Sequence, residues 1–165
     1  DSLGASYNAR TLQAWGEASY NFEAGTAQLE PFANLSYVNL STDGFTETGG
    51  AAALTTASNT VEATFTTLGL RARTDARLNG SDVTLHGMLG WRHGFSDTPT
   101  SRMRFASGGN AFNIAGVPLV EDTLVLDAGV DMTVSENASL SLAYGGILGS
   151  GVEDHSASLS LNMQF

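Results

Sequence analysis

The chain contains no cysteine and no lysine, and only 3 of its 165 residues are proline. Without cysteine there is neither a disulfide framework nor a thiolate metal site. Charged residues make up 15% of the chain, whereas soluble domains usually contain about 25%. Serine, threonine, asparagine and the 19 glycines take their place. This composition is unusual for an ordinary soluble globular domain.

The formal net charge is −10, and all seven basic residues are arginine. Nucleic acids and anionic lipid headgroups bind proteins through clusters of basic residues. We therefore expect no nucleic-acid partner. The chain also has no apolar run of about 18 residues, which excludes a transmembrane helix but leaves open a transmembrane barrel of alternating strands.

Apolar and polar residues alternate with a period of two in segment after segment. Because successive side chains of a strand point to opposite faces, each segment predicts a strand with one apolar and one polar register. Phe32 is out of register, and Val61–Phe65 has the opposite parity to the segment that follows, which predicts a β-bulge near Thr66–Thr67 or a separate extension. The pattern predicts about seven strands: Thr11–Phe22, Leu29–Tyr37, Leu68–Leu78, Val83–Phe95, Leu124–Val134, Leu140–Tyr144 and His155–Phe165.

The predicted strands are longer than the usual globular strand of about 5 or 6 residues, and match the 9 to 11 or so that cross a bilayer with tilt. Their links alternate in length. Glu23–Ala27, Asn79–Asp82 and Ser135–Asn137 are short, whereas Ser41–Asn59 and Ser96–Val120 are long and rich in glycine, serine and threonine. Short periplasmic turns and long extracellular loops are typical of an outer-membrane β-barrel. We expect the long links to be flexible loops and Phe165 to lie in the periplasm.

Charged residues fall on the polar register of the predicted strands, where a water-filled lumen could hydrate or pair them. We predict a lumenal charge network of Glu17, Glu30, Arg71, Arg73, Arg77, Arg92, Asp127 and Asp131. The three histidines stand apart from any carboxylate–nucleophile arrangement in the sequence, and the known catalytic motifs are absent. We therefore expect the chain not to be an enzyme, with no catalytic residue, no cofactor and no metal.

Several segments, taken in order, resemble the C-terminal β-domain of autotransporters. They are LEPFANLSYVNL (Leu29–Leu40), TLGLRA (Thr67–Ala72), LGWRHGF (Leu89–Phe95), FNIAGVPLVEDTLVLDAGVD (Phe112–Asp131), LAYGGILGSGVEDH (Leu142–His155) and the terminal Phe165. The resemblance implies an all-β, antiparallel transmembrane barrel of about twelve strands with a linker helix in its pore. An N-terminal passenger would reach the cell surface through that pore. The whole chain, 1–165, would form the C-terminal part of such a barrel domain.

The function that we predict is an outer-membrane translocator that anchors and exports a passenger. Its expected partners are outer-membrane lipid, its own passenger or linker helix, and barrel strands from a preceding part of the protein. The alternating final strand, with Leu159, Leu161, Met163 and Phe165 on one face, resembles the signal that the barrel-assembly machinery captures by strand addition. Two alternatives remain: a self-contained porin-like or structural barrel without a passenger, and a soluble β-sandwich adhesin.

Overall fold

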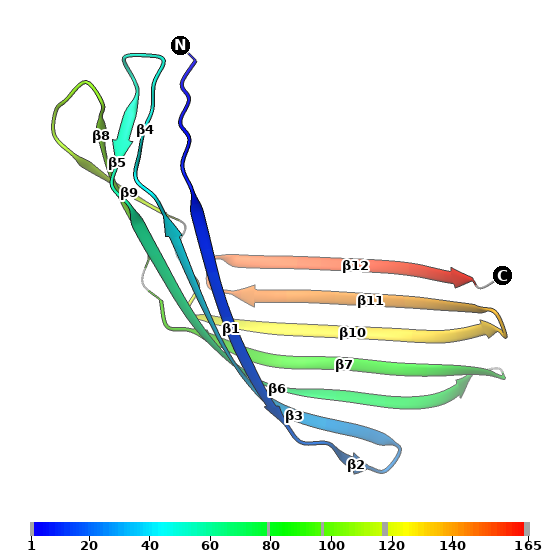
Figure 1. Ribbon diagram of the computed structural model, residues 1–165. Coiled ribbons are helices and arrows are strands. Elements are labelled where there is room, and N and C mark those ends of the chain that lie inside the picture. Colours follow the sequence, from blue (N-terminus) through cyan, green and yellow to red (C-terminus); the bar gives the residue numbers. More distant parts are fainter. Residues whose placement is uncertain (1, 79, 97, 117–118, 164–165) are drawn as a thin grey trace. The chain divides into compact units, whose positions relative to one another are not determined.

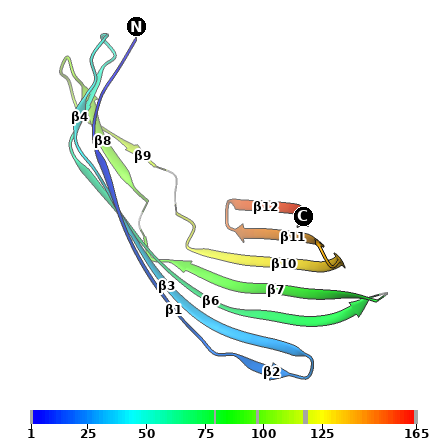
Figure 2. The same cartoon turned by 45° about the vertical axis from the view of Figure 1, so that its right-hand side comes forward.

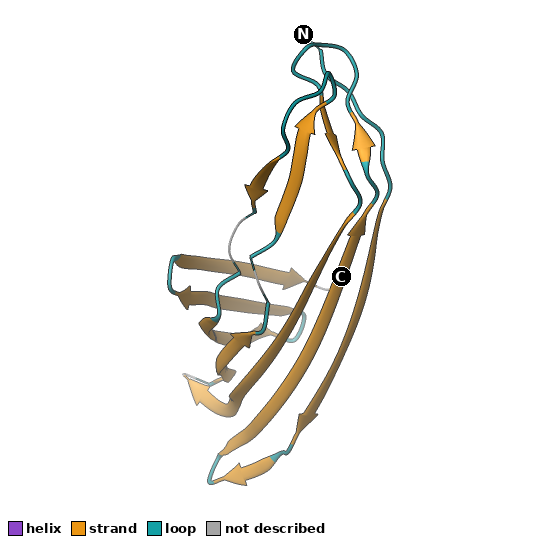
Figure 3. Ribbon diagram, turned by 90° about the vertical axis from the view of Figure 1, so that its left-hand side faces the viewer, coloured by secondary structure: helices purple, strands orange, loops and turns teal. Residues whose placement is uncertain are grey.

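The computed structural model describes residues 2–78, 80–96, 98–116 and 119–163. Figure 3 shows only strands and their connections, in agreement with the predicted all-β class. Across these ranges no helix is long and apolar enough to span a membrane. The strands are β1 (Ala9–Ser19), β2 (Phe22–Ala24), β3 (Ala27–Thr42), β4 (Phe45–Thr46), β5 (Leu54–Thr56), β6 (Asn59–Leu78), β7 (Ser81–Gly94), β8 (Thr100–Phe105), β9 (Phe112–Ala115), β10 (Asp122–Ser135), β11 (Ala138–Gly149) and β12 (Val152–Met163).

The strands form two sheets. In the larger sheet the order is β1-β3-β6-β7-β10-β11-β12, with β2 paired to β3 beside this path. In the smaller sheet the order is β4-β5-β8-β9. The long strands of the larger sheet follow one another in chain order (Figure 1), as expected for neighbouring strands joined by hairpins.

Contacts divide the chain into two compact units, of which the larger comprises 16–35, 65–93 and 120–165. Its β10 pairs antiparallel with β7 from Asp122↔His93 to Met132↔Val83, and β11 pairs with β12 throughout. Short turns join β2 to β3, β6 to β7 and β10 to β11, and all three open at the same end of this unit (Figure 1). Glycine supplies the left-handed backbone in the first two turns, with φ of 68° at Gly25 and 88° at Gly80. The predicted short turns are therefore confirmed.

The second unit comprises 1–15, 36–64 and 94–119 and contains the smaller sheet. Its strands lie within the two long links, β4 and β5 in the first, β8 and β9 in the second (Figure 2). β8 joins the two links by pairing with β5, from Leu54↔Phe105 to Thr56↔Met103. The two long links thus contain short paired strands, which are individually too short to predict from a local pattern. Their flexibility stays a prediction.

The first predicted strand, Thr11–Phe22, is in fact two strands separated at Tyr20 and Asn21. β2 pairs with β3 from Phe22↔Leu29 to Ala24↔Ala27, and the same register places Tyr20 opposite Pro31. The backbone N–H of Tyr20 donates to the carbonyl of Pro31 at 3.2 Å. Proline has no N–H to return a hydrogen bond. The ladder therefore breaks at this position.

β6 is one strand of 20 residues, and the boundary between the two compact units falls within it, after Thr64. The β-bulge near Thr66–Thr67 or separate extension stays a prediction. The even-numbered register of β6 changes from polar at Thr60 and Glu62 to apolar at Leu68 and Leu70. Glu62 accepts hydrogen bonds from Tyr37 Oη at 2.6 Å and from Asn39 Nδ2 at 3.0 Å. Glu62, which lies before the parity change, thus has hydrogen-bond partners of its own on β3.

Apolar side chains of the larger unit stay exposed along their predicted register. Leu159 is 70% exposed, Leu161 61% and Leu142 53%. Among the described apolar residues of the whole chain, Phe32, Ala53 and Val83 form the complete set of buried side chains. A β-sandwich would bury such a face against a second layer. The exposed face instead suits strands whose apolar side meets lipid.

Candidate functional site

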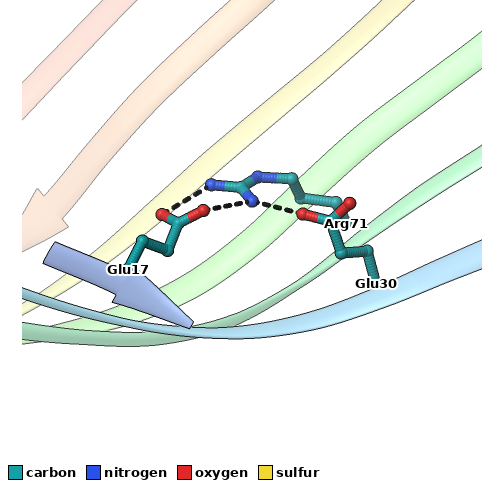
Figure 4. A network of polar contacts seen from close by, with 3 residues as sticks. All are labelled: Glu17, Glu30 and Arg71. Atoms are coloured by element: carbon teal, nitrogen blue, oxygen red, sulfur yellow. Dashed lines mark hydrogen bonds and ion pairs between the residues drawn. The ribbon is translucent and has the colours of Figure 1, made fainter. Parts of the chain in front are cut away.

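Arg71 on β6 lies at the centre of an ion-pair cluster that joins three neighbouring strands (Figure 4). Its Nη1 lies 2.8 Å from Oε1 of Glu17 on β1 and 2.6 Å from Oε1 of Glu30 on β3, and its Nη2 lies 3.0 Å from Oε2 of Glu17. The fork of the guanidinium binds one carboxylate through two hydrogen bonds and the second through one. The structure therefore brings together three of the predicted charges.

Phe32, which broke the alternation of its strand, lies beneath this cluster. The Arg71 guanidinium stacks on its ring at 3.9 Å from the centroid. A Cβ atom on Gly69 would lie 2.6 Å from the Phe32 ring, and one on Gly90 would lie 3.8 Å from it. Two glycines on neighbouring strands thus leave room for the ring to lie flat on the sheet, where it is only 7% exposed. The sequence showed that Phe32 is irregular, but not that Gly69 and Gly90 form a slot for its ring, called here the glycine slot.

Other predicted charges also find partners on the same register, and several of these partners were missed. Arg77 pairs with Asp82 at 2.7 Å, and Arg73 approaches Asp75 at 3.9 Å. Asp131 lies 3.3 Å from Nδ1 of His86. Asp75 and His86 lie on the polar register of their predicted strands, and Asp82 follows the same alternation at the start of β7. What the sequence did not show is which charges pair.

Two hollows lie on this polar face of the larger unit. The first, about 670 Å³, is lined at the short-turn end by Asp75, Arg77, Asp82 and Asp131. The second, about 430 Å³, is lined by Glu30, Arg71, Arg73, His86 and Asp127. Arg92 stands apart from these and approaches Thr67 Oγ1 at 3.5 Å. The polar register of the larger unit therefore carries side chains of both charges, and charged side chains line both hollows.

Two further clusters lie on the apolar register, at the ends of the strands opposite the short turns. In the first, Oδ1 of Asp122 accepts hydrogen bonds from Trp91 Nε1 at 2.9 Å and His93 Nδ1 at 2.8 Å. Asp122 is the first residue of β10, beyond its apolar stretch. The hydrogen bond from His93, together with that from Trp91, holds the pKa of Asp122 below its usual value.

The second cluster places His155 between Tyr144 Oη, 2.6 Å from its Nδ1, and Glu153 Oε1, 2.9 Å from its Nε2. His93 and His155 thus each have a carboxylate partner: Asp122 lies opposite His93 in the β7–β10 pairing, and Glu153 lies two residues before His155 on β12. That neither histidine is catalytic stays a prediction. Tyr144 and His155 form no part of the lining of the hollows that we describe. Within the described ranges no group of three or more His, Asp or Glu side chains could hold a metal ion.

Replacing Arg71 with methionine is expected to lower the free energy of unfolding by about 1–2 kcal/mol. Two carboxylates would lose their shared cation, although Arg71 is 38% exposed and water would offset part of the loss. Arg77→Met is the matched control, since both members of its ion pair are at least 69% exposed. Its cost should be close to zero, because solvent screens an exposed ion pair. Chemical denaturation checks both values, and equal effects would show that the Arg71 cluster adds no stability.

Comparison with known proteins identifies the family of this fold. The autotransporter beta-domain family matches residues 1–145. Two proteins of Serratia marcescens, each named extracellular serine protease, are 40% identical to the chain over 166 residues. The match covers 100% of this chain but 16% of either relative. The chain therefore belongs to the autotransporter β-domain family and is an outer-membrane translocator domain.

Proposed function

We propose that this chain is the C-terminal part of a translocating barrel and that its polar register lines the pore. The Arg71 cluster carries this proposal, because it holds charges of three strands on one face while leucines occupy the other. Charges toward a water-filled lumen and apolar groups toward lipid are the arrangement of a membrane barrel. We propose that residues 1–165 act as one barrel domain with no catalytic residue of its own.

The pore would pass an N-terminal passenger and hold its linker helix. Charged side chains that line the hollows, Arg73, Asp127 and Asp131 among them, would contact this segment. The name serine protease describes the relatives as whole proteins, of which this chain matches 16%. We therefore place any such activity in the passenger.

The larger sheet has β1 and β12 at the two ends of its strand order. Each has an edge available for pairing with a further strand. We propose that strands from a preceding part of the protein fill the gap and close a barrel of about twelve strands, an even number as in bacterial outer-membrane barrels. The outward leucines then face the outer-membrane lipid.

We propose that the barrel-assembly machinery recognises β12 through its edge and its alternating register. Leu159, Leu161 and Met163 lie exposed on β12, at 70%, 61% and 56%. Phe165, the fourth residue of the predicted signal, lies outside the described residues. An edge strand with one apolar face is suited to capture by strand addition.

The passenger test uses the full-length protein with an epitope tag in front of residue 1 of this chain. We expect the tag on intact cells to be accessible to antibody and to external protease. A tag that stays protected in cells whose barrel is fully inserted would favour the alternative of a structural barrel without a passenger.

Orientation is tested separately, since the chain has no cysteine of its own. Cysteine at Ser107, between β8 and β9, should react with a membrane-impermeant maleimide on intact cells, because we place the long links outside. Cysteine at Asn137, in the short turn between β10 and β11, should react only after the outer membrane is permeabilised. The reverse pattern would refute a periplasmic C-terminus.

A further inference from the structure

Arg102 and Arg104 lie on one face of β8 in the smaller sheet, because alternate residues of a strand point the same way. Opposite them on the neighbouring strands are Asn113, paired with Arg102, and Thr55, paired with Arg104. The other face of β8 carries Met103 and Phe105. This small sheet thus has one apolar face and one polar face with two positive charges.

These two arginines have no carboxylate partner among the residues that the structure describes. The arginine ion pairs in those ranges are the ones that Arg71, Arg73 and Arg77 make. Two residues along a strand span about 7 Å, so the two positive charges are close neighbours. Two adjacent cations without a counter-charge create a local positive potential that attracts an anion, although the chain as a whole carries a net charge of −10.

Arg102 and Arg104 line a hollow of about 370 Å³, together with Thr55, Thr56, Ala57, Met103 and Ala111. The threonine hydroxyls are already engaged: Thr55 Oγ1 donates to the Phe45 carbonyl at 3.1 Å and Thr56 Oγ1 to the Arg102 carbonyl at 3.1 Å. The arginines therefore supply the free donors. A planar guanidinium matches the paired oxygens of a phosphate or sulfate group and binds them in bidentate fashion.

We propose that Arg102 and Arg104 form a binding site for a phosphate or sulfate group. Asn59, the first residue of β6, donates to the carbonyl of Thr100, the first residue of β8, at 3.5 Å. This hydrogen bond holds the start of β8 beside the start of β6 within the same unit. A phosphate or sulfate group can be carried by a lipid headgroup or by a carbohydrate, and the experiment distinguishes these two sources.

The test compares the full-length protein with its R102Q/R104Q variant in detergent, with heparin as a sulfated probe. We expect the double variant to bind heparin about tenfold more weakly, because two charge-assisted hydrogen-bond donors are lost. Inorganic phosphate should compete, and added salt should weaken binding. Arg10→Gln is the matched control: Arg10, on β1, is also exposed and has no ion pair within the described ranges. It should leave binding unchanged.

Heparin binding that survives R102Q/R104Q, or that falls equally with Arg10→Gln, would overturn the site. Vesicles of phosphatidylglycerol provide the lipid arm: tighter binding to them than to heparin would identify a lipid headgroup as the carrier, and tighter binding to heparin would identify a carbohydrate. The R102K/R104K variant is the control for misfolding. It keeps both charges and should retain most of the binding. The site rests on the proposed orientation only for its access from outside. Cysteine labelling that refuted that orientation would leave the heparin result standing.

Discussion

Arginine in place of Leu159 is expected to destabilise the inserted domain by about 2–4 kcal/mol, the cost of a charge on the lipid face near the bilayer midplane. Leu159 lies near the middle of β12, opposite Leu142 on β11, and is 70% exposed. In our proposal this exposed side chain faces lipid. A guanidinium there would have to leave water or distort the bilayer around it.

Ser160→Arg is the matched control, because it places the same charge one residue further along the same strand. Ser160 pairs with Ser141, which lines the larger hollow on the polar register. The new arginine would then point to the water-filled side, and we expect a change below about 1 kcal/mol. Urea unfolding in lipid vesicles and the heat-modifiable fraction in cell envelopes measure both variants. Equal losses would show that β12 does not separate a lipid face from a polar face.

The strand registers of the larger unit could be predicted because apolar and polar residues alternate along the whole length of each strand. Leu124, Leu126 and Val130 keep one parity along β10, and the structure pairs them with Trp91, Leu89 and Leu85 on β7. The long links show no such alternation, because β4 has only two residues and β5 only three. Their order comes from partners far along the chain, which a local pattern does not contain.

The residues of the candidate site could be predicted from the sequence, but their arrangement in space could not. Alternation placed Glu17, Glu30 and Arg71 on one register, yet only the stagger of β1, β3 and β6 brings the three side chains together. The break opposite Pro31 has a local cause, the missing N–H, and could have been predicted from β3 alone. The glycine slot depends on three strands at once, so Phe32 stood in the sequence as an unexplained exception.

Alanine at Gly69 is the second large effect that we expect, and it follows from that slot. The added methyl carbon would lie 2.6 Å from two ring carbons of Phe32 and 2.7 Å from the Leu89 carbonyl oxygen. The ring has little freedom to retreat, since Arg71 covers its other side at 3.9 Å. Overpacking of this kind costs about 1–3 kcal/mol, and the same clash should slow assembly of the barrel.

Gly16→Ala is the control for Gly69→Ala, because Gly16 also lies within a strand and a Cβ atom there would meet nothing within 4 Å. It should be neutral. The double variant Phe32→Ala with Gly69→Ala should lose less stability than the sum of the single variants, since removing the ring relieves the clash. Denaturation midpoints of the four proteins give the coupling energy. Additive losses would mean that Gly69 is needed for some reason other than the Phe32 ring, whereas a large positive coupling would identify the glycine as the space that allows an aromatic ring on the polar register.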